Sequence, residues 1–202
     1  MAETSLAEEV VGRFWATEPT ALSVPLPGWL LVTEDEAVAV TVARLYDARR
    51  RSPRLSANDR ELLLSAERIP ILLDEGSYVV TRLILGDDID PAHVCDGTTF
   101  LDPMAQTGEP CGCPGSLADR RAAARSGSGP KPDVKLCFRL TEAPEIGMFL
   151  FTSSSWPFFE SVRRAVSDRA NTKSVKWTMR LQRNVLTTRS GMTVRFTFPL
   201  VS

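Results

Sequence analysis

The chain has few of the residues on which catalysis and membrane insertion depend. Its 202 residues include one histidine, His93, and four cysteines, so a pair of catalytic or metal-binding histidines is excluded. The sequence contains no G-x-S-x-G nucleophile elbow, P-loop or dinucleotide-binding glycine motif. No apolar run approaches the roughly 18 to 20 residues that cross a bilayer. We therefore expect a protein that is not an enzyme, has no small-molecule substrate and spans no membrane.

An excess of charge of either sign is also absent. The 24 basic and 25 acidic residues nearly cancel, so no overall field draws the chain to a phosphate backbone. The length suits one core with loop insertions, and we expect a single domain over residues 1–202. Glu3, Glu8 and Glu9 break the basic and apolar layout of a signal peptide. The sequence therefore predicts a cytoplasmic protein.

Hydrophobic periodicity predicts an α+β fold on a mainly antiparallel sheet. Apolar and polar residues alternate over 134–140, 175–182 and 192–198, as they do in half-buried strands. Weaker patterns predict further strands at residues 29–32, 69–73, 78–85 and 146–152, and either a strand or an ordered arm at residues 9–15.

Two or three helices are expected to pack on this sheet. Residues 33–36, Thr-Glu-Asp-Glu, have the pattern of a capping box that begins a helix. Ser116 is a candidate N-cap for a helix over 116–125, and residues 153–157 open a third helix. Residues 48–68 are charged and alternate poorly, which predicts a loop insertion with a short helical turn.

The most specific chemical signal is a glycine- and proline-rich knuckle over residues 91–115. It contains a C-x15-C-x-C pattern of thiols and the only imidazole of the chain: His93, Cys95, Cys111 and Cys113. Thiolates and imidazoles are the ligands that zinc prefers in tetrahedral sites. Two thiols one residue apart reach one ion only if the backbone turns sharply, which Gly112 permits. The pattern predicts a structural zinc site, and the alternative is a set of reduced cysteines without an ion.

The sequence leaves the fourth ligand open between two residues. On an extended segment His93 points the same way as Cys95, whereas Cys137 lies on the polar face of its predicted strand. We favour His93 and keep Cys137 as the alternative. A disulfide is less expected, because reducing compartments disfavour it and Cys111 with Cys113 would close a strained ring. Four protein ligands leave no position for water, so we expect no catalytic role.

Two basic runs are candidates for phosphate contacts. They consist of Arg49, Arg50, Arg51 and Arg54, and of Arg120, Arg121, Arg125 and Lys131. The alternative for both is a solvated helix face or a helix C-terminus whose dipole the arginines neutralise. Aromatic residues are not interleaved with them as they are in base-stacking surfaces, which favours the solvated interpretation.

An ordered series of short segments carries a resemblance to a known family. The segments are Glu9-Val10-Val11-Gly12-Arg13-Phe14, Trp29 with Val32-Thr33, Cys111-Gly112-Cys113-Pro114, Asp119-Arg120-Arg121-Ala122-Ala123, Gly127-Ser128-Gly129-Pro130, Phe138-Arg139-Leu140, Pro144 with Gly147, and Ser153-Ser154-Ser155-Trp156. In this order and spacing the chain resembles the large recombination directionality factors of actinobacterial temperate phages.

This resemblance implies a protein that binds a large serine integrase and switches it from integrating phage DNA to excising it. The integrase performs the chemistry, and the factor reaches DNA only through the integrase. Two alternatives remain. One is a zinc-containing nucleic-acid-binding protein that uses the arginine runs. The other is a metal-dependent hydrolase, which needs an open coordination position near an acid such as Asp96 or Asp102.

Overall fold

A computed structural model of the chain describes residues 10–17, 25–53, 56–86, 91–168, 174–187 and 191–202. In these residues twelve strands form one sheet in the order β12-β11-β5-β9-β10-β1-β2-β4-β3, with β6 beside β9, β7 beside β6 and β8 beside β7. The strands are β1 (Val10–Thr17), β2 (Pro25–Thr33), β3 (Ala48–Arg51), β4 (Arg60–Leu64), β5 (Arg68–Leu73), β6 (Tyr78–Gly86), β7 (Pro91–Cys95), β8 (Phe100–Asp102), β9 (Lys131–Leu140), β10 (Met148–Ser153), β11 (Val175–Thr187) and β12 (Thr193–Val201). Only the pair of β1 and β10 is parallel among the described strand pairs.

Strand β9 joins the two parts of the sheet. It pairs with β10 along one edge, and along the other edge first with β6 and then, at Arg139 and Leu140, with β5. Strands β5 and β6 therefore follow one another along β9 instead of pairing as a hairpin. The alternating residues of β9 are fully buried, namely Val134, Leu136, Phe138 and Leu140. The period-two pattern thus predicted the core face of this strand correctly.

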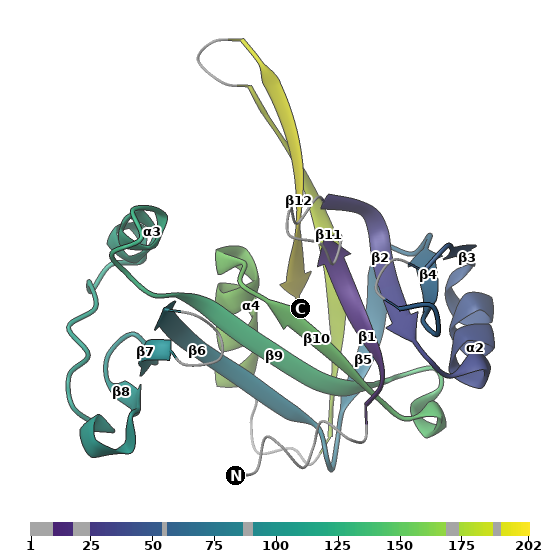
Figure 1. The fold of residues 1–202 in the computed structure, drawn as a ribbon, viewed down its shortest axis with the longest axis horizontal. Coiled ribbons are helices and arrows are strands. Elements are labelled where there is room, and N and C mark those ends of the chain that lie inside the picture. The colour runs from purple at the N-terminus through teal and green to yellow at the C-terminus, as the bar shows by residue number, and fades with distance from the viewer. Residues whose placement is uncertain (1–9, 18–24, 54–55, 87–90, 169–173, 188–190) are drawn as a thin grey trace.

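Two helices cover one face of the sheet, and a third stands apart from it. Helix α2 (Glu36–Tyr46) buries Val38 and Val42, and α4 (Trp156–Ser167) buries Phe158 and Val162 in the same core. Helix α3 (Leu117–Arg125) has no buried residue and lies with β7 and β8 at one end of the molecule (Figure 1). The α+β fold with a mainly antiparallel sheet is confirmed. No helix in the described ranges is both long and apolar enough to cross a membrane.

The predicted capping box of the first helix is wrong. Asp35, not Thr33, is the N-cap of α2, and its carboxylate accepts hydrogen bonds from the backbone N–H groups of Ala37 at 2.7 Å and Val38 at 3.3 Å. Thr33 ends β2 and is 3% exposed. Its hydroxyl donates a hydrogen bond to the carbonyl of Val11 at 2.6 Å and accepts one from the backbone N–H of Asp35 at 3.1 Å. Thr33 thus ties β2 to β1 and to the residue that caps the helix.

The predicted loop over residues 48–68 is also wrong. Strands β3 and β4 pair there from Ala48 opposite Leu64 to Arg51 opposite Glu61. Strand β4 buries Leu62 and Leu64 on the core face, and on its other face Glu61 is only 1% exposed. A strand that is covered on both faces does not alternate between apolar and polar residues, which explains why the pattern was misleading.

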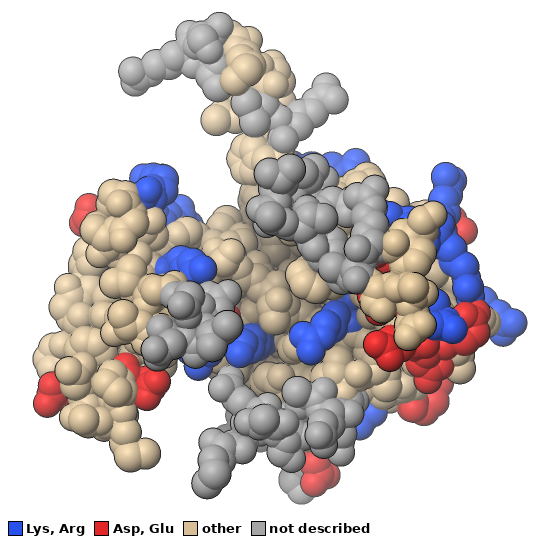
Figure 2. All heavy atoms as spheres, viewed as in Figure 1, with Lys and Arg blue, Asp and Glu red and all other residues tan. Residues whose placement is uncertain are grey.

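Strands β11 and β12 extend beyond the rest of the sheet. Strand β11 pairs with β5 only as far as Arg180 opposite Arg68, whereas its pairing with β12 continues to Thr187 opposite Thr193. Figures 1 and 2 show this two-stranded end projecting from the body of the molecule. We call residues 182–187 and 191–198 the projecting ribbon. The two long C-terminal strands were predicted correctly, but their projection was not.

Candidate metal centre

The four residues of the knuckle meet in a small lobe formed by β7, β8, the 3-10 helix Met104–Gln106 and α3, which we call the knuckle lobe (residues 91–125). One nitrogen or sulfur atom from each of His93, Cys95, Cys111 and Cys113 lies within 4.8 Å of the others. Cys95 is fully buried and Cys111 is 8% exposed. All four cysteines of the chain are free thiols. The cluster has the residues and the proximity to hold a metal ion.

The spacing of the cluster suits a tetrahedral ion better than a disulfide. The Sγ atoms of Cys95 and Cys113 are 3.6 Å apart, and the Sγ of Cys113 is 3.6 Å from Nε2 of His93. Two ligands of a tetrahedral zinc ion, with bonds of about 2.0–2.3 Å, lie about 3.5–3.8 Å from each other. A disulfide requires sulfurs only about 2.05 Å apart. These ligand atoms therefore already lie at the edge length of a tetrahedron.

The local sequence explains how two distant segments come together. His93 and Cys95 share one face of β7 because side chains alternate along a strand. Asp96 then closes a tight turn, since its Oδ1 accepts hydrogen bonds from the backbone N–H groups of Thr98 at 2.7 Å and Thr99 at 2.8 Å. The N–H of Cys111 donates to the carbonyl of Thr98 at 3.0 Å. This bond places the second pair of thiols beside the first.

Gly112 performs the role that the sequence predicted for it. Its φ is +70°, and a Cβ built there would meet no atom within 4 Å. The left-handed backbone is costly for residues with a side chain. It turns the chain between Cys111 and Cys113 so that both thiols face the cluster.

Arg120 of α3 stabilises the knuckle lobe through hydrogen bonds to two of its backbone carbonyls. Its Nε donates to the carbonyl of Pro114 at 2.6 Å, and its Nη2 donates to the carbonyl of Gly97 at 2.7 Å. The guanidinium thus joins the turn after Cys95 to the segment after Cys113. The next residue, Arg121, forms an ion pair of 2.7 Å with Glu160 of α4. These contacts connect the cluster, α3 and the sheet-covering helix α4.

Burial sets the protonation of the cluster in the absence of an ion. It raises the pKa of the Cys95 thiol and of the Cys113 thiol, and it lowers the pKa of His93. A neutral imidazole is ready to bind a metal, whereas the thiols must lose their protons. A divalent cation supplies the positive charge that stabilises thiolates. Metal binding at this site therefore releases protons and weakens at acidic pH.

The structure separates the residues that sequence reasoning left open. Cys137 lies outside the cluster: it is 2% exposed on β9, where it pairs with Tyr78 and Leu150. Asp96 closes the turn with its carboxylate, as described above, and Asp102 pairs with Val94 at the other end of the β7–β8 hairpin. Sequence reasoning missed the turn at Asp96. An Asp-Gly dipeptide directly after a cysteine is the signal that could have revealed it.

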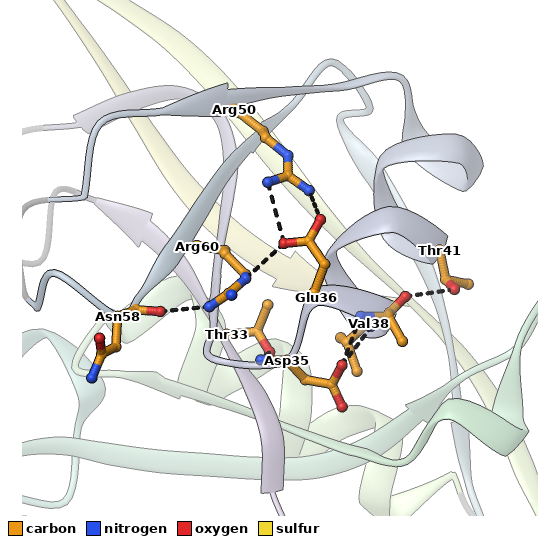
Figure 3. A network of polar contacts seen from close by, with 9 residues as sticks. Thr33, Asp35, Glu36, Val38, Thr41, Arg50, Asn58 and Arg60 are labelled. Atoms are coloured by element: carbon orange, nitrogen blue, oxygen red, sulfur yellow. Dashed lines mark hydrogen bonds and ion pairs between the residues drawn. The ribbon is translucent and has the colours of Figure 1, made fainter.

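The arginine runs are mostly engaged within the molecule. Arg50 forms an ion pair with Glu36 at the start of α2, and Arg60 contacts the same carboxylate at 2.7 Å (Figure 3). Arg51 lies 4.0 Å from Glu61. In the second run Arg120 and Arg121 make the contacts described above. Arg49 and Arg125 are exposed without an ion pair in the parts of the chain that are described, and Arg54 lies outside those parts.

The ion pairs of Glu36 should contribute to the stability of the fold in a way that depends on pH. Hydrogen bonds from Arg50 and then Arg60 lower its pKa from 4.5 to about 2. A depressed folded-state pKa stabilises the fold above the unfolded-state value, and this stabilisation is lost as pH falls from about 4.5 towards 2. We expect the stability difference between the natural chain and Glu36→Gln to be constant above pH 5.5 and to shrink towards pH 2. Urea unfolding across this pH range measures it. A difference that does not change with pH would contradict the prediction.

No protein-family model matches the chain, and no solved structure matches it.

Proposed function

We propose that this protein is a recombination directionality factor, a cytoplasmic regulator that binds a large serine integrase and favours excision over integration. A structural zinc ion at the cluster of His93, Cys95, Cys111 and Cys113 holds the knuckle lobe in shape. Three thiolates and one imidazole form a ligand set typical of structural zinc. The recombination chemistry stays with the integrase, and this chain acts as a binding module.

One observation carries the proposal: the segments that resemble the family contact one another in the fold. Thr33 donates its hydrogen bond to Val11, and a Cβ at Gly147 would lie 2.6 Å from Val11. The rings of Phe14 and Phe138 have centroids 5.8 Å apart. The ordered motifs are thus packing partners, and residue types that must fit together support a resemblance of the whole fold better than isolated short matches do.

The knuckle lobe supports a structural role for the metal over hydrolysis. Four protein ligands complete a tetrahedral ion and leave no position for a reactive water. A hydrolase also needs a general base close to that water. Asp96 accepts two backbone hydrogen bonds in its turn, and those bonds lower its pKa. A carboxylate stabilised in this way is a weak base.

The test is recombination between hybrid attachment sites by a purified large serine integrase from the same genome. We expect excision only when this protein is added, and a complex of the two proteins that elutes as one peak in size-exclusion chromatography. Arg121→Gln with Glu160→Gln, which removes the ion pair between α3 and α4, should reduce stimulation without unfolding the core. The matched control is Glu36→Gln, which removes the ion pairs of Glu36 with Arg50 and Arg60 at the other end of the molecule. Neither stimulation nor a complex with the integrase would refute the proposal.

A further inference from the structure

The three thiols of the cluster differ in how well a small molecule can reach them. Cys95 is fully buried and Cys111 is 8% exposed, whereas Cys113 is half-buried. His93, whose Nε2 is 3.6 Å from the Sγ of Cys113, is also half-buried. The susceptibility of a cysteine to oxidants increases with its exposure and with its thiolate character. Cys113 is therefore the thiol of the cluster that an oxidant dissolved in water meets first.

A second thiol lies within reach of Cys113. The Sγ atoms of Cys95 and Cys113 are 3.6 Å apart, which is only about 1.5 Å longer than a disulfide bond. Cys95 is held at the end of β7, where it pairs with Leu83 of β6 and with Phe100 of β8. Cys113 follows Gly112, where a Cβ would meet no atom within 4 Å. The turn at Gly112 has room to move, so Cys113 can approach Cys95 while β7 stays in place.

The other two cysteines are poorer partners for Cys113. A bond between Cys111 and Cys113 would close a strained ring across one residue. The backbone N–H of Cys111 also donates to the carbonyl of Thr98 at 3.0 Å, which fixes this part of the turn. Cys137 lies outside the cluster, on β9. The geometry therefore leaves Cys95 as the thiol that is able to pair with Cys113.

We propose that Cys113 is a site of oxidation by hydrogen peroxide and that Cys95 resolves the oxidised form, so that the zinc site is a reversible redox switch. The thiolate of Cys113 attacks the peroxide, an S–O bond forms as the O–O bond breaks, and hydroxide leaves. The thiolate of Cys95 then attacks the Sγ of Cys113, forms the S–S bond and displaces a second hydroxide. The two sulfurs lose two electrons, which the peroxide gains. The two hydroxides take up two protons and become water.

The disulfide releases the metal ion. Zinc binds thiolates, and the sulfurs of a disulfide carry no charge. Only His93 and Cys111 are then left as ligands, whereas a structural zinc site needs four. In reducing compartments such disulfides are transient and serve redox sensing, and thiols reverse them. This inference rests on the zinc ion of the proposed function and adds a form of regulation, because the metal that shapes the knuckle lobe is lost on oxidation.

The test treats the purified, zinc-loaded full chain with hydrogen peroxide and needs no integrase. A chromogenic zinc chelator follows the release of the ion, and a thiol reagent counts the free thiols. We expect one zinc ion to be released per chain as two of the four free thiols disappear. Digestion and mass spectrometry should find a disulfide between Cys95 and Cys113. Dithiothreitol followed by zinc should restore the metal content.

Two histidine variants form a matched pair for this test. Cys113→His and Cys111→His both keep four ligands, two thiolates and two imidazoles, which is a common set for structural zinc. Cys113→His removes the reactive thiol, so peroxide should release its zinc about tenfold more slowly than from the natural chain. Cys111→His keeps Cys95 and Cys113 and should release zinc as the natural chain does, and so should Cys137→Ala. Release without peroxide is the baseline for each variant, and circular dichroism checks its fold.

The proposal is overturned if the natural chain keeps its zinc in excess peroxide, if the disulfide includes Cys111 or Cys137, or if both histidine variants release zinc equally fast. Peptide mapping of the natural chain decides the matter even where a histidine variant does not fold. The redox switch and the integrase regulator fail separately. Zinc retained under peroxide leaves the recombination result untouched, and a lack of stimulated excision leaves the oxidation result untouched.

Discussion

Replacing Cys113 by serine is expected to remove one bound zinc ion per chain and to lower the free energy of unfolding by about 3 kcal/mol or more. Metal-binding free energy contributes directly to folding where the ligands come together only in the folded state. Here the ligands come from β7 and from a segment that reaches it through the turn at Gly112. Cys95 and Cys111 also belong to the hydrophobic core. Elemental analysis of purified protein and thermal unfolding with and without a chelator measure the two effects.

Cys137→Ala is the matched control for the metal prediction. Cys137 is buried, as Cys95 and Cys111 are, but it lies on β9, outside the group of four. We expect this variant to keep one zinc ion and to lose about 1 kcal/mol of stability, as a small side chain buried in a core does. Loss of the ion from Cys137→Ala, or a natural chain that purifies without any metal, would show that the proposed ligand set is wrong.

Trp29→Ala is expected to reduce the free energy of unfolding by about 3–5 kcal/mol, the usual effect of removing a large buried aromatic side chain. Trp29 is fully buried on β2, and its ring meets Phe151 of β10 edge to face with centroids 5.2 Å apart. Its Nε1 also donates a hydrogen bond to the carbonyl of Glu67 at 3.2 Å. The residue therefore joins β2 to the chain that enters β5, two strands that are not neighbours in the sheet.

Two phenylalanine variants separate the hydrogen bond from the packing. Trp29→Phe keeps an aromatic ring and loses the bond to Glu67, which should cost about 1–2 kcal/mol. Trp15→Phe should be nearly neutral, because the buried indole nitrogen of Trp15 has no hydrogen-bond partner among the described residues. Denaturant unfolding followed by circular dichroism gives these differences. Equal losses for the two phenylalanine variants would contradict this division.

Local patterns in the sequence predicted much of the fold, because strand alternation and helix capping depend on residues that are close together in the sequence. Alternation predicted β9, β11 and β12, and Ser116 caps α3 as expected through a hydrogen bond from the backbone N–H of Asp119. The same local reasoning misplaced the N-cap of α2. Thr33 and Asp35 are both good caps by type, but Thr33 is still paired with Arg60 of the distant strand β4, so the helix begins after Asp35. Local reasoning also missed β3 and β4, because a strand that is buried on both faces shows no alternation of apolar and polar residues.

The sequence predicted the candidate ligands of the metal site, but it did not predict the contacts that hold those ligands in place. Thiol spacing, Gly112 and the position of His93 are features of the sequence alone. The choice of His93 over Cys137 required the tertiary structure, because the spacing along the sequence allows either residue to be the fourth ligand. The structural role of Arg120 was also not predictable from the sequence. It was a candidate for phosphate contact, and the fold directs it to two backbone carbonyls inside the lobe.

By itself the sequence determined the α+β composition, the main strands and the three thiols of the cluster, because side-chain periodicity and ligand chemistry act over short distances along the chain. Only the tertiary structure decided which charges remain available at the surface. Arginines that are adjacent in sequence are engaged by Glu36, Glu160 and backbone carbonyls. Arg183 of β11 is engaged in the same way by Glu67, because the fold brings these two distant parts of the chain together.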